Sequence, residues 1–286
     1  MTLMEMVERA AARLDAAGAS FGHGTTRAFD EAAWLVLWRL GLPLDALEEV
    51  AERRLSGAEE AALDALVGER IATRKPAAYL TGEAWLQGLP FFVDERVIVP
   101  RSPLAEVIVE GLAEPWLAAP PARILDLCTG NGSLAVLAAL AWPEAHVDAT
   151  DLSSDALAVA QRNVARHGLA ARVRLRQGDG LAAAEGRYAL VICNPPYVNQ
   201  ASMAALPAEY LAEPALALAG GEDGMDFIRA LLPALPAHLA PGGVLLLEVG
   251  HERAHFEAAF PRLQPVWIET SAGDDAVLLL TTEDLA

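Results

Sequence analysis

The sequence has few cysteines, few basic residues and no long uncharged apolar run. Its 286 residues include only two cysteines, Cys128 and Cys193, and each ends an apolar run. Two cysteines are too few for a disulfide framework and lack the companions of a metal site, so buried free thiols are expected. No metal site is predicted.

Basic residues are scarce, because 21 Lys and Arg stand against 39 Asp and Glu, for a formal net charge of -18. This excess of negative charge opposes nonspecific binding to nucleic-acid phosphates and favours a basic protein as partner. No stretch of about 18 apolar residues lacks a charge or a proline, and acids interrupt the N-terminal segment. Neither a membrane span nor a secretory signal is expected, and we predict a soluble, cytoplasmic protein.

The first part of the chain has the apolar periodicity of helices. Apolar residues recur at three- and four-residue spacing over 3–17, 27–39 and 44–54, which predicts three helices. A fourth helix is predicted from Ser56, where Glu59 completes a capping-box pattern, to about residue 74. Residues 1–82 are therefore expected to form a helical domain.

The residue pattern changes from helical to strand-like over residues 83–120. The β-type residues between 85 and 99 are broken by two turn-forming stretches, which predicts a short hairpin. Ser102 then provides an N-cap, with Pro103 in the first turn of a helix. This segment is expected to be a structured linker, and Arg101 is able to point into a catalytic cleft.

Strands and helices alternate from residue 121 to 286. This alternation predicts an α/β fold with a doubly wound, mainly parallel sheet. Residues 273–275 are expected to form a loop that joins the last two strands as an antiparallel pair. The predicted strands lie near 123–128, 146–150, 172–177, 188–193, 243–249, 263–269 and 276–282.

A strand, a glycine-rich turn and a helix start follow one another over residues 124–133. Gly130 and Gly132 permit a tight turn and a close backbone approach. The next strand ends at Asp151, whose carboxylate can accept both hydroxyls of a ribose. Asp126 would repel a pyrophosphate, so the loop suits S-adenosylmethionine, which carries an ammonium and a sulfonium, better than a dinucleotide. The alternative for each acid is structural, because an Asp at a strand end often caps the next helix.

The tetrapeptide of residues 194–197 ends an apolar strand, at the edge of the sheet where open α/β folds bind ligands. The amide oxygen of Asn194 and a backbone carbonyl oriented by the prolines can accept two hydrogen bonds from one planar NH2 group. Tyr197 adds a flat face. Such a clamp suits an amide or a nucleobase amine, and the alternative is a proline-rich turn capped by Asn194. Asp179, after the third strand, is expected beside the adenine.

The stretch His251-Glu252-Arg253-Ala254-His255 matches the pattern of a zinc-binding helix. The helix that it opens is short, and no helix further along the chain offers a third ligand. We therefore expect His251 and His255 to be surface residues.

With these motifs, the chain resembles the S-adenosylmethionine-dependent protein-glutamine methyltransferases. That resemblance covers nearly the whole chain and implies a seven-stranded Rossmann-like domain over 121–286. It also implies a substrate-recognition domain over 1–82, with 83–120 as the linker. Residues 92–103 and 206–214 are most similar to the branch that methylates a glutamine of ribosomal protein L-three. The release-factor branch, the alternative, usually has Pro-Arg-Pro-Asp where this chain has residues 100–103.

The resemblance and the residue patterns together define a candidate site. Two further alternatives are an adenine-specific nucleic-acid methyltransferase, which would need a basic track, and a ribosome assembly factor without catalysis. Gly180 lacks the bulky side chain that relatives carry there. The substrate contacts, which include the catalytic group at 194–197, are predicted to be Arg101, Asn194, Pro195, Pro196 and Tyr197. The cofactor contacts are predicted to be Asp126, Cys128, Thr129, Gly130, Asn131, Gly132, Asp151, Asp179, Gly180 and Asn194.

Overall fold

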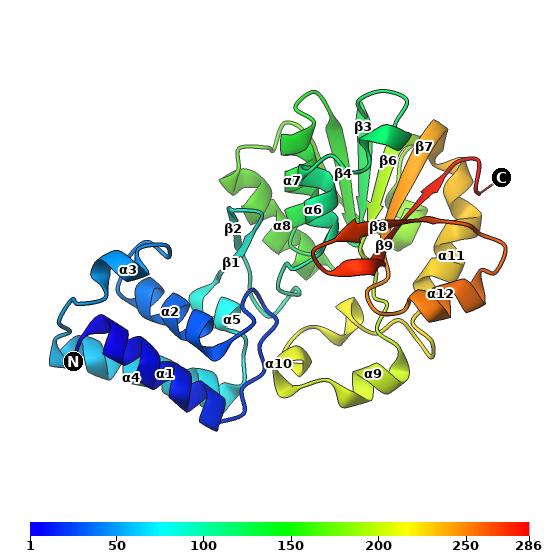
Figure 1. Ribbon diagram of the computed structural model, residues 1–286. Coiled ribbons are helices and arrows are strands. Elements are labelled where there is room, and N and C mark those ends of the chain that lie inside the picture. The colour runs from blue at the N-terminus through cyan, green and yellow to red at the C-terminus, as the bar shows by residue number, and fades with distance from the viewer. Residues whose placement is uncertain (286) are drawn as a thin grey trace. The chain divides into compact units, whose positions relative to one another are not determined.

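The computed structural model describes residues 1–285, which divide into two compact units (Figure 1). The N-terminal unit comprises Met1–Ala84 together with Leu206–Glu213. The sheet unit comprises Trp85–Ala205 and the chain from Pro214 onward. The roles predicted for residues 1–82, 83–120 and 121–286 stay predictions.

The N-terminal unit is built on three helices, α1 (Leu3–Ala16), α2 (Ala28–Arg39) and α4 (Gly57–Thr73). Their apolar faces pack into one buried aliphatic core. The predicted capping box is present, since the Ser56 side chain accepts from the Glu59 N–H and the Glu59 side chain from the Ser56 N–H. A short helix that was not predicted, α5 (Ala77–Thr81), follows α4.

The prediction of a helix over residues 44–54 is wrong. Only α3 (Leu47–Val50) is helical there. The carbonyls of Ala51 and Arg53 instead accept the N–H groups of Met4 and Leu3, at 3.0 and 2.9 Å. First-turn N–H groups have no acceptor within their own helix, and residues 51 and 53 provide acceptors for two such groups of α1.

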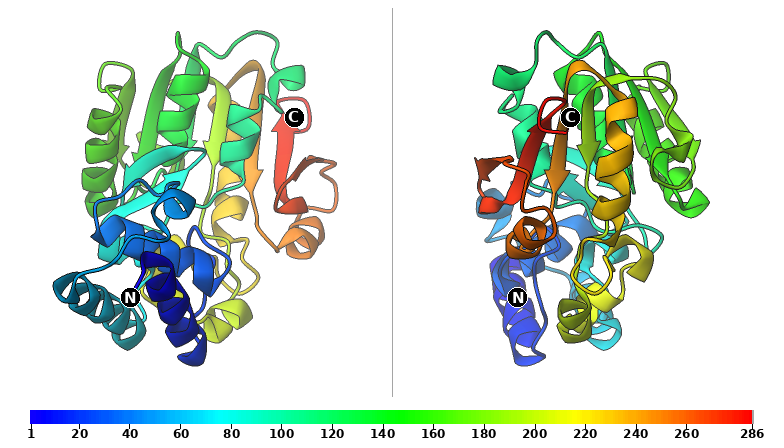
Figure 2. Two further views of the ribbon diagram at one scale, coloured as in Figure 1. Left: turned by 60° about the vertical axis from the view of Figure 1, so that its left-hand side comes forward. Right: turned by 90° about the vertical axis from the view of Figure 1, so that its right-hand side faces the viewer.

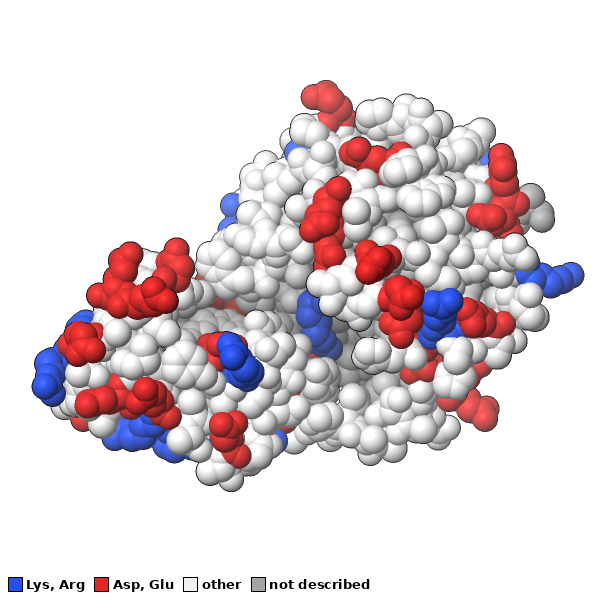
Figure 3. All heavy atoms as spheres, in the orientation of Figure 1, with Lys and Arg blue, Asp and Glu red and all other residues white. Residues whose placement is uncertain are grey.

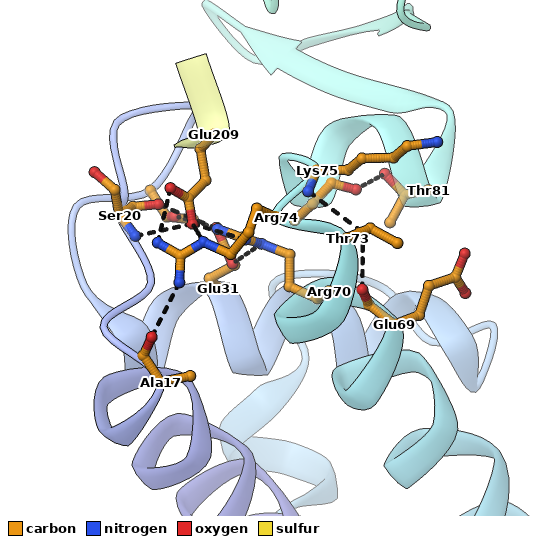
Figure 4. A network of polar contacts seen from close by, with 12 residues as sticks. Ala17, Ser20, Glu31, Glu69, Arg70, Thr73, Arg74, Lys75, Thr81 and Glu209 are labelled. Carbon is orange, nitrogen blue, oxygen red and sulfur yellow. Dashed lines mark hydrogen bonds and ion pairs between the residues drawn. The ribbon is translucent and has the colours of Figure 1, made fainter. Parts of the chain in front are cut away.

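A buried ion network joins Leu206–Glu213 to the rest of the N-terminal unit (Figure 4). The Arg70 guanidinium on α4 is fully buried and donates to Glu31 at 2.8 Å and to Glu209 at 3.1 Å. Arg74 pairs with the same Glu209 carboxylate at 2.9 Å. Glu209 lies on α10 (Ala208–Leu211). Burial alone would raise the pKa of Glu209, but hydrogen bonds from the Ser20 N–H and from Arg70 outweigh it and lower that pKa.

The sheet unit is built on a seven-stranded sheet in the order β5-β4-β3-β6-β7-β9-β8. Only β9 runs antiparallel to its neighbours, β7 and β8. This confirms the predicted α/β class and its Rossmann-like, mainly parallel sheet. A hairpin of β1 (Glu83–Leu86) and β2 (Leu89–Phe92) forms a second, two-stranded sheet. The seven strands are β3 (Arg123–Leu127), β4 (His146–Asp151), β5 (Val173–Gln177), β6 (Tyr188–Cys193), β7 (Leu239–Glu248), β8 (Val266–Thr270) and β9 (Gly273–Thr281).

Helices cover both faces of this sheet, as Figure 2 shows. One buried core includes side chains of α6 (Leu104–Val109), α7 (Ser133–Ala141) and α8 (Ser154–Arg166). The other includes side chains of α11 (Asp226–Ala234) and α12 (Arg253–Ala259). Five short helices lie in the connections: η1 (Glu114–Trp116), η2 (Gly180–Ala183), α9 (Gln200–Ala205), η3 (Ala215–Ala217) and η4 (Leu235–Ala237).

Two turn predictions need correction. Residues 273–275 do not form a loop, because β9 starts at Gly273, which pairs with Thr270, and residues 271–272 alone make the turn. A two-residue connection is sufficient between antiparallel strands. The predicted hairpin is also shorter than expected, since β2 ends at Phe92 and residues 97–99 belong to no strand.

The sheet topology positions the candidate site. Strands β3 to β7 are parallel, so their carboxyl ends meet at one edge of the sheet. From β3, the strands β4 and β5 follow toward one side of the sheet, whereas β6 and β7 lie on the other side of β3. Open α/β sheets bind ligands at the point where the strand order reverses in this way, here between β3 and β6. No helix among the described residues is long and apolar enough to cross a membrane.

Candidate functional site

An open cavity lies within the sheet unit at the carboxyl edge of the sheet. The structure brings ten of the predicted site residues to its wall and places four of them elsewhere. On the wall are Arg101, Cys128, Thr129, Gly130, Asn131, Asp151, Asp179, Gly180, Asn194 and Pro196. Asp126, Gly132, Pro195 and Tyr197 do not line it.

The turn after β3 has an unusual backbone. Gly130 and Gly132 have φ angles of 54° and 80°. A Cβ at Gly132 would lie 3.0 Å from the Cβ of Ala160 on α8, so both conformation and close helix packing require glycine there. Cys128 also has a positive φ, 59°, which is costly for a residue with a side chain and is common at functional sites. Cys128 is half-buried on the cavity wall, so the prediction of two buried thiols is correct for Cys193 only.

Asp151 ends β4 beside the glycine turn. Its two carboxylate oxygens accept the backbone N–H groups of Gly130 and Ser153, each at 2.9 Å. Burial raises the pKa of Asp151, although these backbone hydrogen bonds act in the opposite direction. Each oxygen keeps acceptor capacity for a further donor. The arrangement can therefore bind a pair of ligand hydroxyls, and contact with a ribose stays a prediction.

Asp126 lies behind the turn, where it is fully buried. The Thr129 hydroxyl donates to its Oδ2 at 2.5 Å, whereas its Oδ1 has no hydrogen-bond partner. Burial raises the pKa of Asp126 to about 7. Asn131 Nδ2 is likewise buried without a partner. Asn131 lies on the cavity wall, so a ligand carboxylate could use its unsatisfied donor, whereas Asp126 is enclosed behind the turn.

Asn194 follows β6 and lies on the cavity wall. Its side-chain amide has no hydrogen-bond partner among the residues that the structure describes. Arg101 lies on the same wall and donates to the Val99 carbonyl at 2.9 Å. The cavity therefore combines a glycine turn, a carboxylate and an unpaired amide.

Tyr197 was predicted to offer a flat face to the substrate, but it does not line the cavity. Its hydroxyl donates to Glu248 at 2.7 Å, and its ring lies against Gly250. Pro195 is buried, whereas Pro196 lies on the wall. The tetrapeptide thus presents Asn194 and Pro196 to the cavity and holds Tyr197 away from it.

Several apolar wall residues were not predicted from the sequence. The ring of Phe227, near the start of α11, comes within 3.8 Å of the position that a Cβ at Gly180 would occupy. An apolar side chain therefore borders the space that Gly180 leaves open. Because Gly180 has no side chain, the sequence already indicated that another residue must supply the apolar surface at this position. The other unpredicted wall residues include Leu152, Pro214, Leu216 and Ala217.

The histidines of the zinc-like stretch are exposed, as predicted. His255 Nδ1 pairs with Glu252 at 2.5 Å, and Glu252 also accepts from Asn199 at 2.7 Å. No group of three His, Cys, Asp or Glu side chains suited to a metal occurs within residues 1–285.

Comparison with known proteins gives concordant results. The family model described as methyltransferase small domain matches residues 105–221. The chain is similar to the ribosomal protein uL3 glutamine methyltransferase of Bordetella pertussis, with 57% identity over 99% of this chain and 96% of that protein. It is 49% identical to the protein of the same name from Burkholderia pseudomallei, over 99% of this chain and 95% of that one. A methyltransferase structure from Pyrococcus furiosus shares the fold, with 21% identity, a TM-score of 0.50 and coverage of 69% and 90%.

Proposed function

Because the chain belongs to the family of ribosomal protein uL3 glutamine methyltransferases, we propose that it methylates the side-chain amide nitrogen of a glutamine in ribosomal protein uL3. The enzyme uses S-adenosylmethionine as its methyl donor. The observation that carries the assignment to an amide substrate is the unpaired amide of Asn194 on the wall that also holds the glycine turn and Asp151.

The residues of the cavity fit S-adenosylmethionine, which when bound supplies an electrophilic methyl group on a sulfonium. Asp151 would accept the ribose hydroxyls. The unsatisfied Asn131 Nδ2, on the cavity wall, suits the carboxylate of its amino-acid part. Asp126, predicted as a cofactor contact, is fully buried behind the wall, so a direct bond to the ammonium is not part of the proposal. Phe227 and Leu152 supply apolar surface for the adenine.

Asn194 would position the glutamine. An amide nitrogen is a poor nucleophile because its lone pair is delocalised, so orientation must supply much of the rate. The Asn194 oxygen would accept one hydrogen of the substrate NH2 group. The carbonyl of Pro195, which is itself buried but stands between the wall residues Asn194 and Pro196, would accept the other. Both acceptors bind more strongly as positive charge develops on that nitrogen, which stabilises the transition state.

The charge distribution favours a protein substrate over a nucleic acid. In Figure 3, acidic side chains gather over α3 of the N-terminal unit, which carries the exposed Glu48 and Glu49. Such a surface repels phosphates and attracts a basic protein. A cytoplasmic location, where ribosomal proteins are made and assembled, is part of the proposal.

Transfer of labelled methyl from S-adenosylmethionine to purified ribosomal protein uL3 tests the proposal. Release factor and adenine-containing DNA and RNA serve as parallel acceptors. We expect label on a glutamine of uL3 alone. Label on release factor only would replace the substrate and keep the chemistry. Label on nucleic acid only would contradict the amide assignment, and no label on any acceptor would support the noncatalytic alternative.

A further inference from the structure

The last residue of β7, Glu248, has a buried carboxylate at the same edge of the sheet as the cavity. One oxygen accepts the hydroxyl of Tyr197 at 2.7 Å, and the other accepts the hydroxyl of Ser102. β7 pairs with β6, so Glu248 comes just after the residue paired with Cys193, which precedes Asn194. Nothing described so far for methyl transfer requires a carboxylate there.

The two hydroxyls that Glu248 binds belong to distant segments of the chain. Ser102 follows Arg101 in the turn that lines the cavity, and its Oγ also accepts the Leu104 N–H at 3.2 Å, at the start of α6. Tyr197 ends the tetrapeptide that presents Asn194. A single carboxylate therefore holds two segments that both contribute to the wall. Charge-assisted hydrogen bonds of this kind are stronger than neutral ones.

Three glycines surround Tyr197 in addition. A Cβ at Gly250 would lie 2.5 Å from Cε2 of the Tyr197 ring. A Cβ at Gly220 would lie 2.7 Å from Cα of Tyr197, and one at Gly224 would lie 2.2 Å from its carbonyl oxygen. Distances this short do not occur between real side chains and their neighbours. The absence of side chains at these glycines lets the surrounding chain pack closely against Tyr197, and in this packing its hydroxyl meets Glu248.

The tetrapeptide is therefore held at both ends. At one end, the pairing of Cys193 with Leu127 and with Leu247 fixes the start of the tetrapeptide. At the other end, Glu248 fixes Tyr197. The two prolines between them have restricted φ angles, so the directions of the Asn194 side chain and of the Pro195 carbonyl follow from these two anchors.

We infer that Glu248 is a positioning residue for methyl transfer, which acts by anchoring Tyr197 and the turn of Ser102. The inference rests on the proposed function, because it names the residue that keeps the amide acceptors of that same site in place. Glu248 does not contact the substrate. Its removal should lower the rate of the chemical step and leave the cofactor site intact, since the glycine turn and Asp151 belong to other strands.

A double-mutant cycle tests the inference. We expect Glu248→Gln and Tyr197→Phe each to lower kcat for uL3 about 10- to 100-fold, as loss of one charge-assisted hydrogen bond implies. The double variant should be no slower than the slower single variant, because the Tyr197–Glu248 bond that Tyr197→Phe removes is among the interactions that Glu248→Gln already weakens.

Affinity for S-adenosylhomocysteine, measured by calorimetry, should stay within about twofold of wild type. Glu106→Gln is the control, because Glu106 also accepts a serine hydroxyl, that of Ser271 at 2.5 Å, away from Tyr197. It should keep wild-type kcat.

Amide hydrogen exchange provides a readout that needs no substrate. The Val198 N–H, next to Tyr197, bonds to the Leu218 carbonyl at 2.8 Å. In Glu248→Gln with S-adenosylhomocysteine bound, this amide should exchange faster than in wild type, and in Glu106→Gln it should not. Multiplicative losses of kcat in the double variant, equal loss of cofactor affinity, or unchanged exchange at Val198 would each overturn the inference. Failure of wild type to label uL3 would instead overturn the proposed function, and the exchange comparison would still decide whether Glu248 anchors Tyr197.

Discussion

The buried carboxyl of Asp126 contributes a pH dependence to the stability of this protein. Burial raises its pKa to about 7, whereas the pKa is about 3.9 in an unfolded chain. The folded state therefore favours the protonated form. The stability that this proton contributes is fully present below about pH 4 and is lost as the pH rises through about 7.

Asp126→Asn should remove this contribution, because asparagine does not titrate. Over the window between about pH 4 and 7, wild type should lose up to about 1.4 kcal/mol of unfolding free energy per pH unit from this group, and the variant should not. Urea unfolding without cofactor, at about pH 5 and pH 8, measures the difference. Identical pH dependence of the two proteins would show that Asp126 does not carry the effect.

Asn194 should matter for turnover far more than for cofactor affinity. Asn194→Ala removes one of the two acceptors that we propose for the substrate amide, and loss of one preorganised hydrogen-bonding group at a reacting centre costs about 100- to 1000-fold in kcat. The matched control is Asn199→Ala, because the Asn199 side chain bonds to Glu252 and does not line the cavity. Steady-state kinetics and binding of S-adenosylhomocysteine check both variants. Equal losses of kcat and affinity for Asn194→Ala would remove it from the substrate clamp.

Phe227 should contribute to cofactor binding. Its ring lies on the cavity wall beside Gly180, which has no side chain to stack on an adenine. Stacking of a base on an aromatic ring contributes about 1–3 kcal/mol, so Phe227→Ala should weaken binding of S-adenosylmethionine about 5- to 100-fold. Phe227→Tyr keeps the ring and should keep most of the affinity. Calorimetry that finds Phe227→Ala and wild type equal would assign the adenine to another part of the wall.

At the scale of elements, the buried ion network should stabilise the N-terminal unit strongly. Arg70→Leu leaves the carboxylates of Glu31 and Glu209 buried without their guanidinium partner, which costs about 3–5 kcal/mol. The control Arg27→Ala breaks the exposed pair with Asp30 and should cost less than about 1 kcal/mol. Chemical denaturation monitored by far-UV circular dichroism compares the two. Similar small losses would mean that the network is not a main source of stability.

The sequence predicted those elements whose signals are local. The capping box at Ser56 and Glu59 lies within one helix turn, and the buried strands are continuous apolar runs. The failed helix over 44–54 depends on α1, whose first N–H groups bond to residues 51 and 53. No periodicity within 44–54 carries that information, because the partners of these carbonyls lie elsewhere in the chain.

The same distinction applies to the site. Asp151 and Asn194 could be placed because each follows a buried parallel strand, and all such strands end at one edge. Glu248 carries the same signal, a carboxylate after the apolar run of β7, and could have been found in this way. Phe227 and Leu216 could not, because they lie outside the strands and reach the wall only through tertiary packing.

At the scale of the whole molecule, net charge should govern association with the substrate. The chain has 39 acids and 21 bases and therefore attracts a basic protein. Salt screens this attraction. Raising the ionic strength from about 0.05 to 0.3 M should raise KM for uL3 several-fold and leave kcat nearly unchanged, because groups inside the cavity are screened less than the exposed surface charges. Initial rates at both salt concentrations measure this. A fall in kcat with constant KM would place the salt effect on the site itself.

The insertion of Leu206–Glu213 into the N-terminal unit has a consequence for how this protein can be divided and recombined. The buried Arg70 finds Glu209 more than a hundred residues further along the chain, between α9 and the cavity residues Pro214 and Leu216. A fragment that ends at residue 84 would therefore contain a buried cation without one of its partners. A chimera that exchanges only residues 1–84 between relatives would combine, within one compact unit, two segments taken from different proteins. The N-terminal unit can be inherited or engineered as a module only when both of its segments travel together.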